Sequence, residues 1–138
     1  MIILDTNVLS ALMHVEPDAG VAAWLDRQPH LSVWTTSVTV FEIRTGLELM
    51  PKGRRRLQKA EAFELLLDRV IDGRVAVFDS EAAELAAECF AKAQRRGRPA
   101  ELRDTMIAGI VMASHATLAT RNGKRFEEIA RSVVNPWG

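Results

Sequence analysis

MIILDTNVLS, residues 1–10, places a carboxylate directly after the first apolar run of the chain. Four apolar residues lead to Asp5, and the polar pair Thr6 and Asn7 follows before apolar residues resume. A short Ile-rich run that stops at turn-prone residues predicts a buried β-strand. Asp5 lies where this strand ends and a helix begins, so it either caps that helix or forms one wall of a polar site.

The pattern of the opening strand returns along the chain. Apolar runs rich in β-branched residues predict strands at 2–5, 31–36, 74–79, 116–120 and 132–136. Apolar residues at helical spacing predict helices at 8–14, 20–28, 37–50, 53–71, 80–97, 101–115 and 123–130. Strands that alternate with helices favour parallel pairing through right-handed crossovers. The sequence therefore predicts an α/β/α sandwich around a central parallel sheet of about five strands.

The composition is that of an ordinary globular chain. Its 138 residues are 48% apolar and 26% charged, and no repeat or linker divides them, so residues 1–138 are expected to form a single domain. No apolar run reaches the ~20 residues of a membrane span, and the opening run is too short for a signal peptide. We therefore expect a cytoplasmic protein. The single cysteine, Cys89, excludes an internal disulfide and a Cys-rich zinc site.

The formal net charge is zero, but the charges are unevenly distributed. Residues 1–50 carry six acidic and two basic side chains, whereas residues 91–138 carry nine basic and four acidic ones. This separation permits an acidic site bordered by basic segments. Four arginines near such a site are candidate RNA phosphate contacts: Arg95, Arg96, Arg98 and Arg121.

Acidic residues lie close to the ends of several predicted strands. In an open parallel sheet a ligand site forms at the carboxyl ends of the strands, near the point where the strand order reverses. Asp5 ends the first strand, Glu42 lies in the helix after the second, and Asp104 lies near the start of the helix that enters the fourth. These acids can meet at one edge of the sheet. Grouped carboxylates repel one another unless a cation such as Mg²⁺ or Mn²⁺ neutralises them.

Each acid also has a simpler explanation. Asp5 could cap the helix after the first strand, and Glu42 could complete a capping box with Thr39. Asp104 lies in a first helical turn, where the helix dipole favours an acid. Asp79 is interpreted as a helix cap and is left out of the site. Glu42 favours a shared site, because it lies within an apolar stretch and no basic residue is evidently placed to pair with it.

Four segments carry a resemblance that covers nearly the whole chain: ILDTNVLSAL, TTSVTVFEIRTGL, GRPAELRDTMIAGIVMASHATLATRNGKRF and VVNPW. Together and in this order they resemble the PIN-domain ribonucleases, and most closely the VapC and FitB toxins of type II toxin–antitoxin systems. The resemblance implies a PIN fold and Mg²⁺- or Mn²⁺-dependent cleavage of RNA. It also implies a homodimer, and an antitoxin that inhibits the toxin and binds operator DNA.

The matching motifs also imply roles for individual residues. The metal-binding and catalytic acids implied by the resemblance are Asp5, Glu42 and Asp104. The polar residues implied to support them are Thr6, Asn7, Thr120 and Asn122, of which the first two steady Asp5 or a water on the metal and the last two line the same edge.

One position departs from the family pattern. Many relatives read Asn-x-x-Asp-Phe where this chain has NGKRF, residues 122–126, so Arg125 stands in place of an acid. If that acid helps to hold a second metal ion, its loss favours a single ion or a lower activity. A catalytically weakened PIN-fold module that acts through its antitoxin and operator complex is therefore the alternative function.

A phospho-receiver switch is a rival from another class of protein. It also places acids at the ends of the first and third strands, here Asp5 and Asp79, and a threonine at the end of the fourth. Such a switch would require adjacent acids after the first strand and a lysine after the fifth. The sequence has DTN and VNPW at these places, which disfavours the rival.

Overall fold

The strands and helices alternate as the sequence predicts in a computed structural model that describes residues 1–126 and 132–138. The strands are β1 (Ile2–Leu4), β2 (Val33–Thr36), β3 (Val75–Ala76), β4 (Thr117–Ala119) and β5 (Val133–Val134). The helices are α1 (Thr6–Leu12), α2 (Ala19–Asp26), α3 (Ser37–Leu49), α4 (Arg54–Leu65), α5 (Ser80–Arg95), α6 (Leu102–Ala113) and α7 (Gly123–Phe126). A 3₁₀ turn, η1 (His30–Ser32), precedes β2, and a π-helical segment, η2 (Leu66–Ile71), continues α4. None of the helices in these two described ranges is long and apolar enough to cross a membrane.

The five strands form one parallel sheet in the order β3-β2-β1-β4-β5. The chain builds outward from β1 to β3 and then returns to the other side of β1 for β4 and β5. The strand order therefore reverses between β1 and β4, which pair along their length. Ligand sites of such sheets form beyond the carboxyl ends of the strands at this point.

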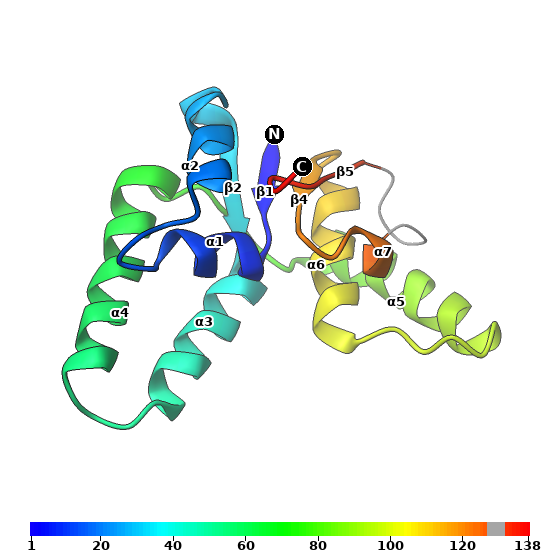
Figure 1. Cartoon of the computed structure of the whole chain (residues 1–138). Helices are drawn as coiled ribbons and strands as arrows, with labels where there is room; N and C mark the ends of the chain where they lie inside the picture. The colour runs from blue at the N-terminus through cyan, green and yellow to red at the C-terminus, as the bar shows by residue number, and fades with distance from the viewer. Residues whose placement is uncertain (127–131) are drawn as a thin grey trace.

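Alternate side chains of the central strands face opposite layers. Ile3 and Leu118 belong to a buried cluster formed with α6, whereas Leu4 and Ala119 belong to a second cluster formed with α1, α3 and α4. Figure 1 shows α2 and α4 on one side of the sheet and α5 and α6 on the other. The predicted α/β/α sandwich with a central parallel sheet of five strands is confirmed.

Side-chain caps determine where the helices after the strands begin. Asp5, Thr36 and Asp79 each accept a hydrogen bond from a backbone N–H in the first turn of α1, α3 and α5. The interpretation of Asp79 as a helix cap is thus confirmed. Asp5 directly follows β1 and Thr36 is the last residue of β2, whereas Asp79 lies three residues beyond the end of β3. The central strands β1 and β2 therefore lead into polar side chains at the same edge of the sheet.

Several elements are shorter than the sequence predicts. The third strand was expected at 74–79, but β3 ends at Ala76, since the exposed Val77 leaves the sheet and the N–H of Phe78 donates to the Ser37 hydroxyl. The helix expected at 53–71 changes to a π-helix after Leu65. The helix expected at 123–130 is seen as α7, and residues 127–130 lie outside the described residues.

Helices α5 and α6 pack against each other at a very short distance. A Cβ atom at Gly109 would overlap the carbonyl oxygen of Ala82 and would lie 2.8 Å from the Cβ of Ala86. Only glycine permits this approach. The contact holds α6, which carries Asp104 in its first turn, against the rest of the layer.

Candidate active site

Asp5 lies at the switch point of the sheet, directly after β1. Its Oδ1 accepts a hydrogen bond from the N–H of Thr6 at 2.8 Å, and its Oδ2 accepts one from the Thr120 hydroxyl at 2.7 Å. Asp5 is 5% exposed and Thr120 is fully buried. The two explanations of Asp5 are therefore not exclusive, because one oxygen caps α1 while the carboxylate also lines a polar hollow.

Asn7 and Asn122 complete the polar network around Asp5. The side-chain amide of Asn7 donates to Oδ2 of Asp5 at 3.4 Å and to the Thr120 hydroxyl at 3.3 Å, while its Oδ1 accepts from the N–H of Arg121. The N–H of Asn122 donates to the same Thr120 hydroxyl. These bonds tie the carboxyl end of β1 to the carboxyl end of β4.

Glu42 reaches the site from the second turn of α3. Its Oε1 accepts a hydrogen bond from the Thr6 hydroxyl at 3.1 Å, and its Oε2 lies 3.7 Å from Nη1 of Arg103. The expectation that Glu42 has no basic partner is therefore wrong. The capping box with Thr39 is also wrong, because Thr36 caps α3 and its hydroxyl accepts from the N–H of Thr39.

Asp104 approaches from the first turn of α6, as predicted. Glu101 caps this helix, and its Oε2 accepts a hydrogen bond from the N–H of Asp104. The side chain of Asp104 is 14% exposed, and its Oδ2 contacts Nη2 of Arg125. The residue that departs from the family pattern thus pairs with one of the three acids.

Burial raises the pKa of all three acids above the ordinary values. For Asp5, the hydrogen bonds from Thr120 and Thr6 and the charge of Arg125 oppose the increase. For Glu42, the opposing groups are Thr6 and Arg103, and the charge of Asp5 adds to the increase. Burial raises the pKa of Asp104 to about 6 even though Arg125 lowers it, and the other acids raise it further. The carboxylates therefore interact electrostatically and their charge is incompletely compensated.

The three acids line one open polar hollow of about 450 Å³. Its other lining residues are Thr6, Asn7, Ser10, Ala11, His14, Arg121, Asn122, Arg125 and Trp137. Thr120 was expected to line this edge, but it is buried behind Asp5 and acts on it through its hydroxyl. All the other residues predicted for the acidic site open onto the hollow.

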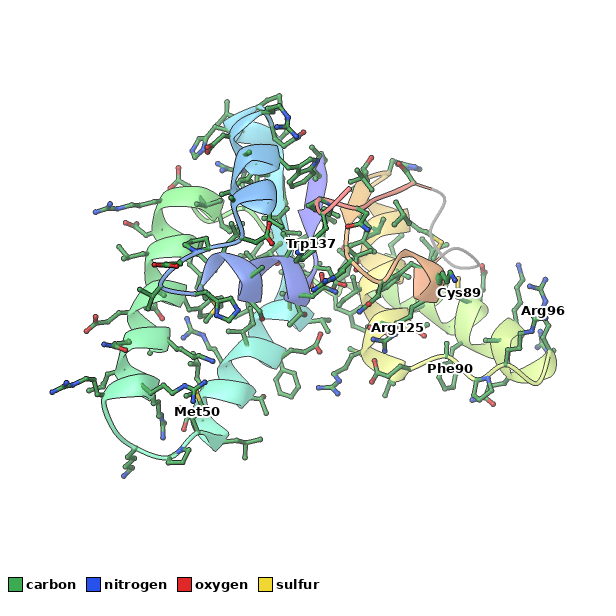
Figure 2. The ribbon with its side chains drawn as sticks, viewed as in Figure 1. Met50, Cys89, Phe90, Arg96, Arg125 and Trp137 are labelled. Carbon is green, nitrogen blue, oxygen red and sulfur yellow. The ribbon has the colours of Figure 1, made fainter. Side chains whose placement is uncertain are left out.

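The four predicted phosphate contacts lie in different places. Arg121 lines the hollow, with its guanidinium carbon 5.0 Å from the ring centre of Trp137. Arg98 lines a smaller adjoining hollow of about 180 Å³, which shares Asp104 and Arg125 with the first. Arg95 and Arg96 line neither hollow. Figure 2 shows Arg96 at the far end of α5, which does not support a contact with a substrate at the acids.

Sequence reasoning missed Arg103, His14 and Trp137. His14 could have been found, because Asn7, Ser10 and His14 follow one another at roughly helical spacing and so share one face. Arg103 precedes Asp104 in the sequence, but its pairing with Glu42 depends on how α6 meets α3. Trp137 borders the core cluster around Leu4 and also lines the hollow.

The hollow presents mainly hard oxygen donors. Within the described residues, no group of three or more His, Cys, Asp and Glu side chains is arranged to hold one metal ion. Mg²⁺ nevertheless binds proteins through only one or two carboxylates and keeps several waters. The buried Asp5 and the half-buried Asp104 share the hollow, and the charge of Asp5 disfavours the charged form of Asp104, so the donor set fits such an ion.

Comparison with known proteins agrees with this geometry. Residues 2–132 match the PIN domain family. The chain is 39% identical to the plasmid stability protein StbB of Pseudomonas syringae pv. tomato and 37% identical to the VapC ribonuclease Y4jK of Sinorhizobium fredii. These alignments cover 99% of this chain and 99% and 98% of the two relatives.

A solved structure is similar along the whole chain. It is the structure of FitAB bound to the IR36 DNA fragment, and it gives a TM-score of 0.88 at 32% identity over 100% of this chain and 96% of the other. The toxin FitB of Neisseria gonorrhoeae is 32% identical, with 99% of each chain covered. The parallel sheet with acids at its switch point thus defines a PIN-type α/β protein. The chain belongs to the PIN domain family, among relatives named VapC ribonuclease and toxin FitB.

Proposed function

We propose that the chain is a metal-dependent endoribonuclease and the toxin of a type II toxin–antitoxin system. The observation that carries this proposal is the meeting of Asp5, Glu42 and Asp104 in one polar hollow at the switch point of the sheet. The ribonuclease and toxin names of its relatives support the same function. We further propose that residues 1–138 form one cytoplasmic domain.

Asp5 and Asp104 are the proposed direct ligands of Mg²⁺, or of Mn²⁺ in its place, and Glu42 is the proposed third acid that acts directly or through water. When bound, such an ion lowers the pKa of a water and stabilises charge on a phosphodiester. Thr120 and Asn7 fix the carboxylate of Asp5, and Thr6 links Asp5 to Glu42. These bonds hold the acids in place before a substrate arrives.

The proposed reaction is hydrolysis of an RNA phosphodiester. The water oxygen forms a bond to phosphorus and the bond from phosphorus to the 3′ oxygen breaks. The electron pair of the broken bond stays on the 3′ oxygen, which takes up a proton, while the attacking water loses one. The products are a 5′-phosphate and a 3′-hydroxyl. Glu42 lies beside Asp5 and is placed to hold the proton that the water releases.

The proposed partners follow from the names of the relatives and from the complexes in which their structures were solved. FitAB, whose toxin FitB is similar to this chain, was solved on a DNA fragment. We propose that this chain likewise binds an antitoxin, forms a homodimer within a toxin–antitoxin hetero-oligomer, and reaches operator DNA through the antitoxin. A partner on the hollow would cover the acids and inhibit cleavage.

Substitution of Asp5 tests the catalytic proposal. Asp5→Asn should lower Mg²⁺-dependent cleavage of a mixed RNA by at least about 100-fold, because a ligand charge is lost. Asn is an equally good helix cap, so the free energy of unfolding should change by less than about 1 kcal/mol. Asp79→Asn is the matched control, since Asp79 caps α5 and does not line the hollow. Full activity of Asp5→Asn would contradict the proposal.

The contact between Arg125 and Asp104 favours a second candidate function. In this alternative the chain is a catalytically weakened binding module that acts through its antitoxin and operator complex. The same assay separates the two functions. A module would show no cleavage of mixed RNA in Mg²⁺ or Mn²⁺, whereas the enzyme would cleave it and would lose that activity when the metal is chelated.

A further inference from the structure

Arg125 occupies an unusual place for a basic residue. It lies on the short helix α7, and its side chain extends toward α6 (Figure 2). Its Nη2 contacts Oδ2 of Asp104 on that helix. It also lines the hollow together with Asp5 and Glu42. Its side chain is 51% exposed although that of Asp104 is 14% exposed. The guanidinium therefore touches Asp104 and remains accessible to a molecule that enters the hollow.

The positive charge of Arg125 interacts electrostatically with more than one acid. Burial raises the pKa of both Asp5 and Asp104, and Arg125 opposes that increase at each of them. Arg103 makes the corresponding ion pair with Glu42. Arg125 is thus the fixed positive charge shared by the two carboxylates that the proposed function assigns to the metal.

We propose that Arg125 supplies the second positive charge of this site and binds the scissile phosphate, in place of a second metal ion. The inference rests on the ribonuclease function proposed above. In two-metal nucleases the two cations stabilise the attacking and the leaving oxygens. A guanidinium is permanently charged, and its forked N–H donors match the oxygens of a phosphate. Arg125 donates no proton in this role and only stabilises the charge on the leaving oxygen.

Three variants test the role of Arg125. Arg125→Ala should lower kcat by about 100-fold, as the loss of one transition-state donor does. Arg125→Lys keeps the positive charge but lacks the paired N–H donors of the guanidinium, so its kcat should lie between those of Arg125→Ala and wild type. Lys124→Ala is the matched control, because it removes a neighbouring positive charge that lines only the adjoining hollow. Thermal unfolding of each variant checks that the fold is retained.

Two measurements do not depend on turnover. With EDTA present, a short single-stranded RNA of mixed sequence should bind Arg125→Ala about tenfold more weakly than wild type in fluorescence anisotropy, and Lys124→Ala should bind nearly as wild type does. By calorimetry, Mg²⁺ should bind Arg125→Ala at least as tightly as wild type, because Asp104 no longer pairs with the guanidinium.

The outcomes separate this inference from the proposed function. Cleavage by Arg125→Ala that equals or exceeds wild type would overturn the inference, since a residue that merely blocks Asp104 would give that result. Weaker Mg²⁺ binding by Arg125→Ala would also overturn it, because Arg125 would then only shape the metal site. If wild type itself cleaves no RNA in Mg²⁺, the ribonuclease function fails, and the RNA-binding measurement in EDTA still decides whether Arg125 binds phosphate.

Discussion

The three acids of the site differ in the groups that stabilise their charged forms. Asp5 receives hydrogen bonds from neutral groups, Glu42 receives one from Thr6 and pairs with Arg103, and Asp104 pairs with Arg125. Burial nevertheless raises the pKa of each acid. The folded chain therefore holds three carboxyls whose ionisation it disfavours, which is the condition that a bound cation relieves.

Asp104 should make stability fall as the pH rises. Its pKa is about 6 in the folded chain against an ordinary 3.8, so the folded state binds the proton more tightly than the unfolded state. The free energy of unfolding should then decrease between pH 3.8 and about 6. At roughly 1.4 kcal/mol per pKa unit, the full shift corresponds to about 3 kcal/mol. Because Asp104 is half-buried in an open hollow where solvent screens its charge, we expect the stability to be lower by about 1–2 kcal/mol once the pH is well above 6. Urea unfolding in EDTA at a series of pH values measures it.

The variant Asp104→Asn isolates this effect. Asn resembles the protonated acid, so the variant should be more stable than wild type at pH 8 and equally stable at pH 3. Asp18→Asn is the control, because Asp18 is exposed and the new side chain can keep the cap on the N–H of Val21. Wild type that remains the more stable protein at pH 8 would show that the ion pair with Arg125 outweighs burial.

At the scale of elements, the sequence predicts what depends on local pattern and misses what depends on packing. The end of β1 just before Asp5 follows from an apolar run that meets turn-prone residues, and the parallel pairing follows from the alternation of strands and helices. The early end of β3 and the π-helical turn after Leu65 were not predicted, because tertiary contacts decide them. The partner of Glu42 was missed for the same reason, since Arg103 approaches it from α6.

The contact between α5 and α6 gives a prediction at this scale. Gly109→Ala should destabilise the fold by about 2 kcal/mol, because the added methyl group overlaps the carbonyl oxygen of Ala82 and the helices must separate. This cost exceeds the roughly 1 kcal/mol by which Ala favours a helix over Gly. The midpoint of urea unfolding measures the change, with an unaltered slope.

Gly46→Ala is the matched control for the helix contact. Gly46 lies within α3, and a Cβ at that position meets nothing within 4 Å. The same substitution should therefore stabilise the protein by about 0.5–1 kcal/mol. Opposite signs for the two glycines support close packing as the cause, whereas stabilisation by both would contradict it.

The whole molecule brings the site together from elements far apart in sequence. Asp5 follows β1, Glu42 lies on α3, Asp104 on α6 and Arg125 on α7, and the sheet separates the layers to which these helices contribute. The basic excess of residues 91–138 reaches the acidic hollow through Arg103, Arg121 and Arg125. A ligand in this hollow contacts both ends of the chain and should stabilise the whole fold.

Mg²⁺ should therefore raise the unfolding temperature of the entire domain. At a free concentration of about 100 times the Kd, a ligand that binds only the folded state adds about 2.7 kcal/mol, or roughly 10 °C for a chain of this size. Calorimetry in MgCl₂ against NaCl of equal ionic strength measures the shift, and Asp5→Asn should show little of it. The shift should also shrink at pH 5, because Asp104, with a pKa of about 6, must lose its proton to bind the ion. If Mg²⁺ raises the unfolding temperature of wild type and of Asp5→Asn equally, the ion binds elsewhere, and the acids at the switch point are not its ligands.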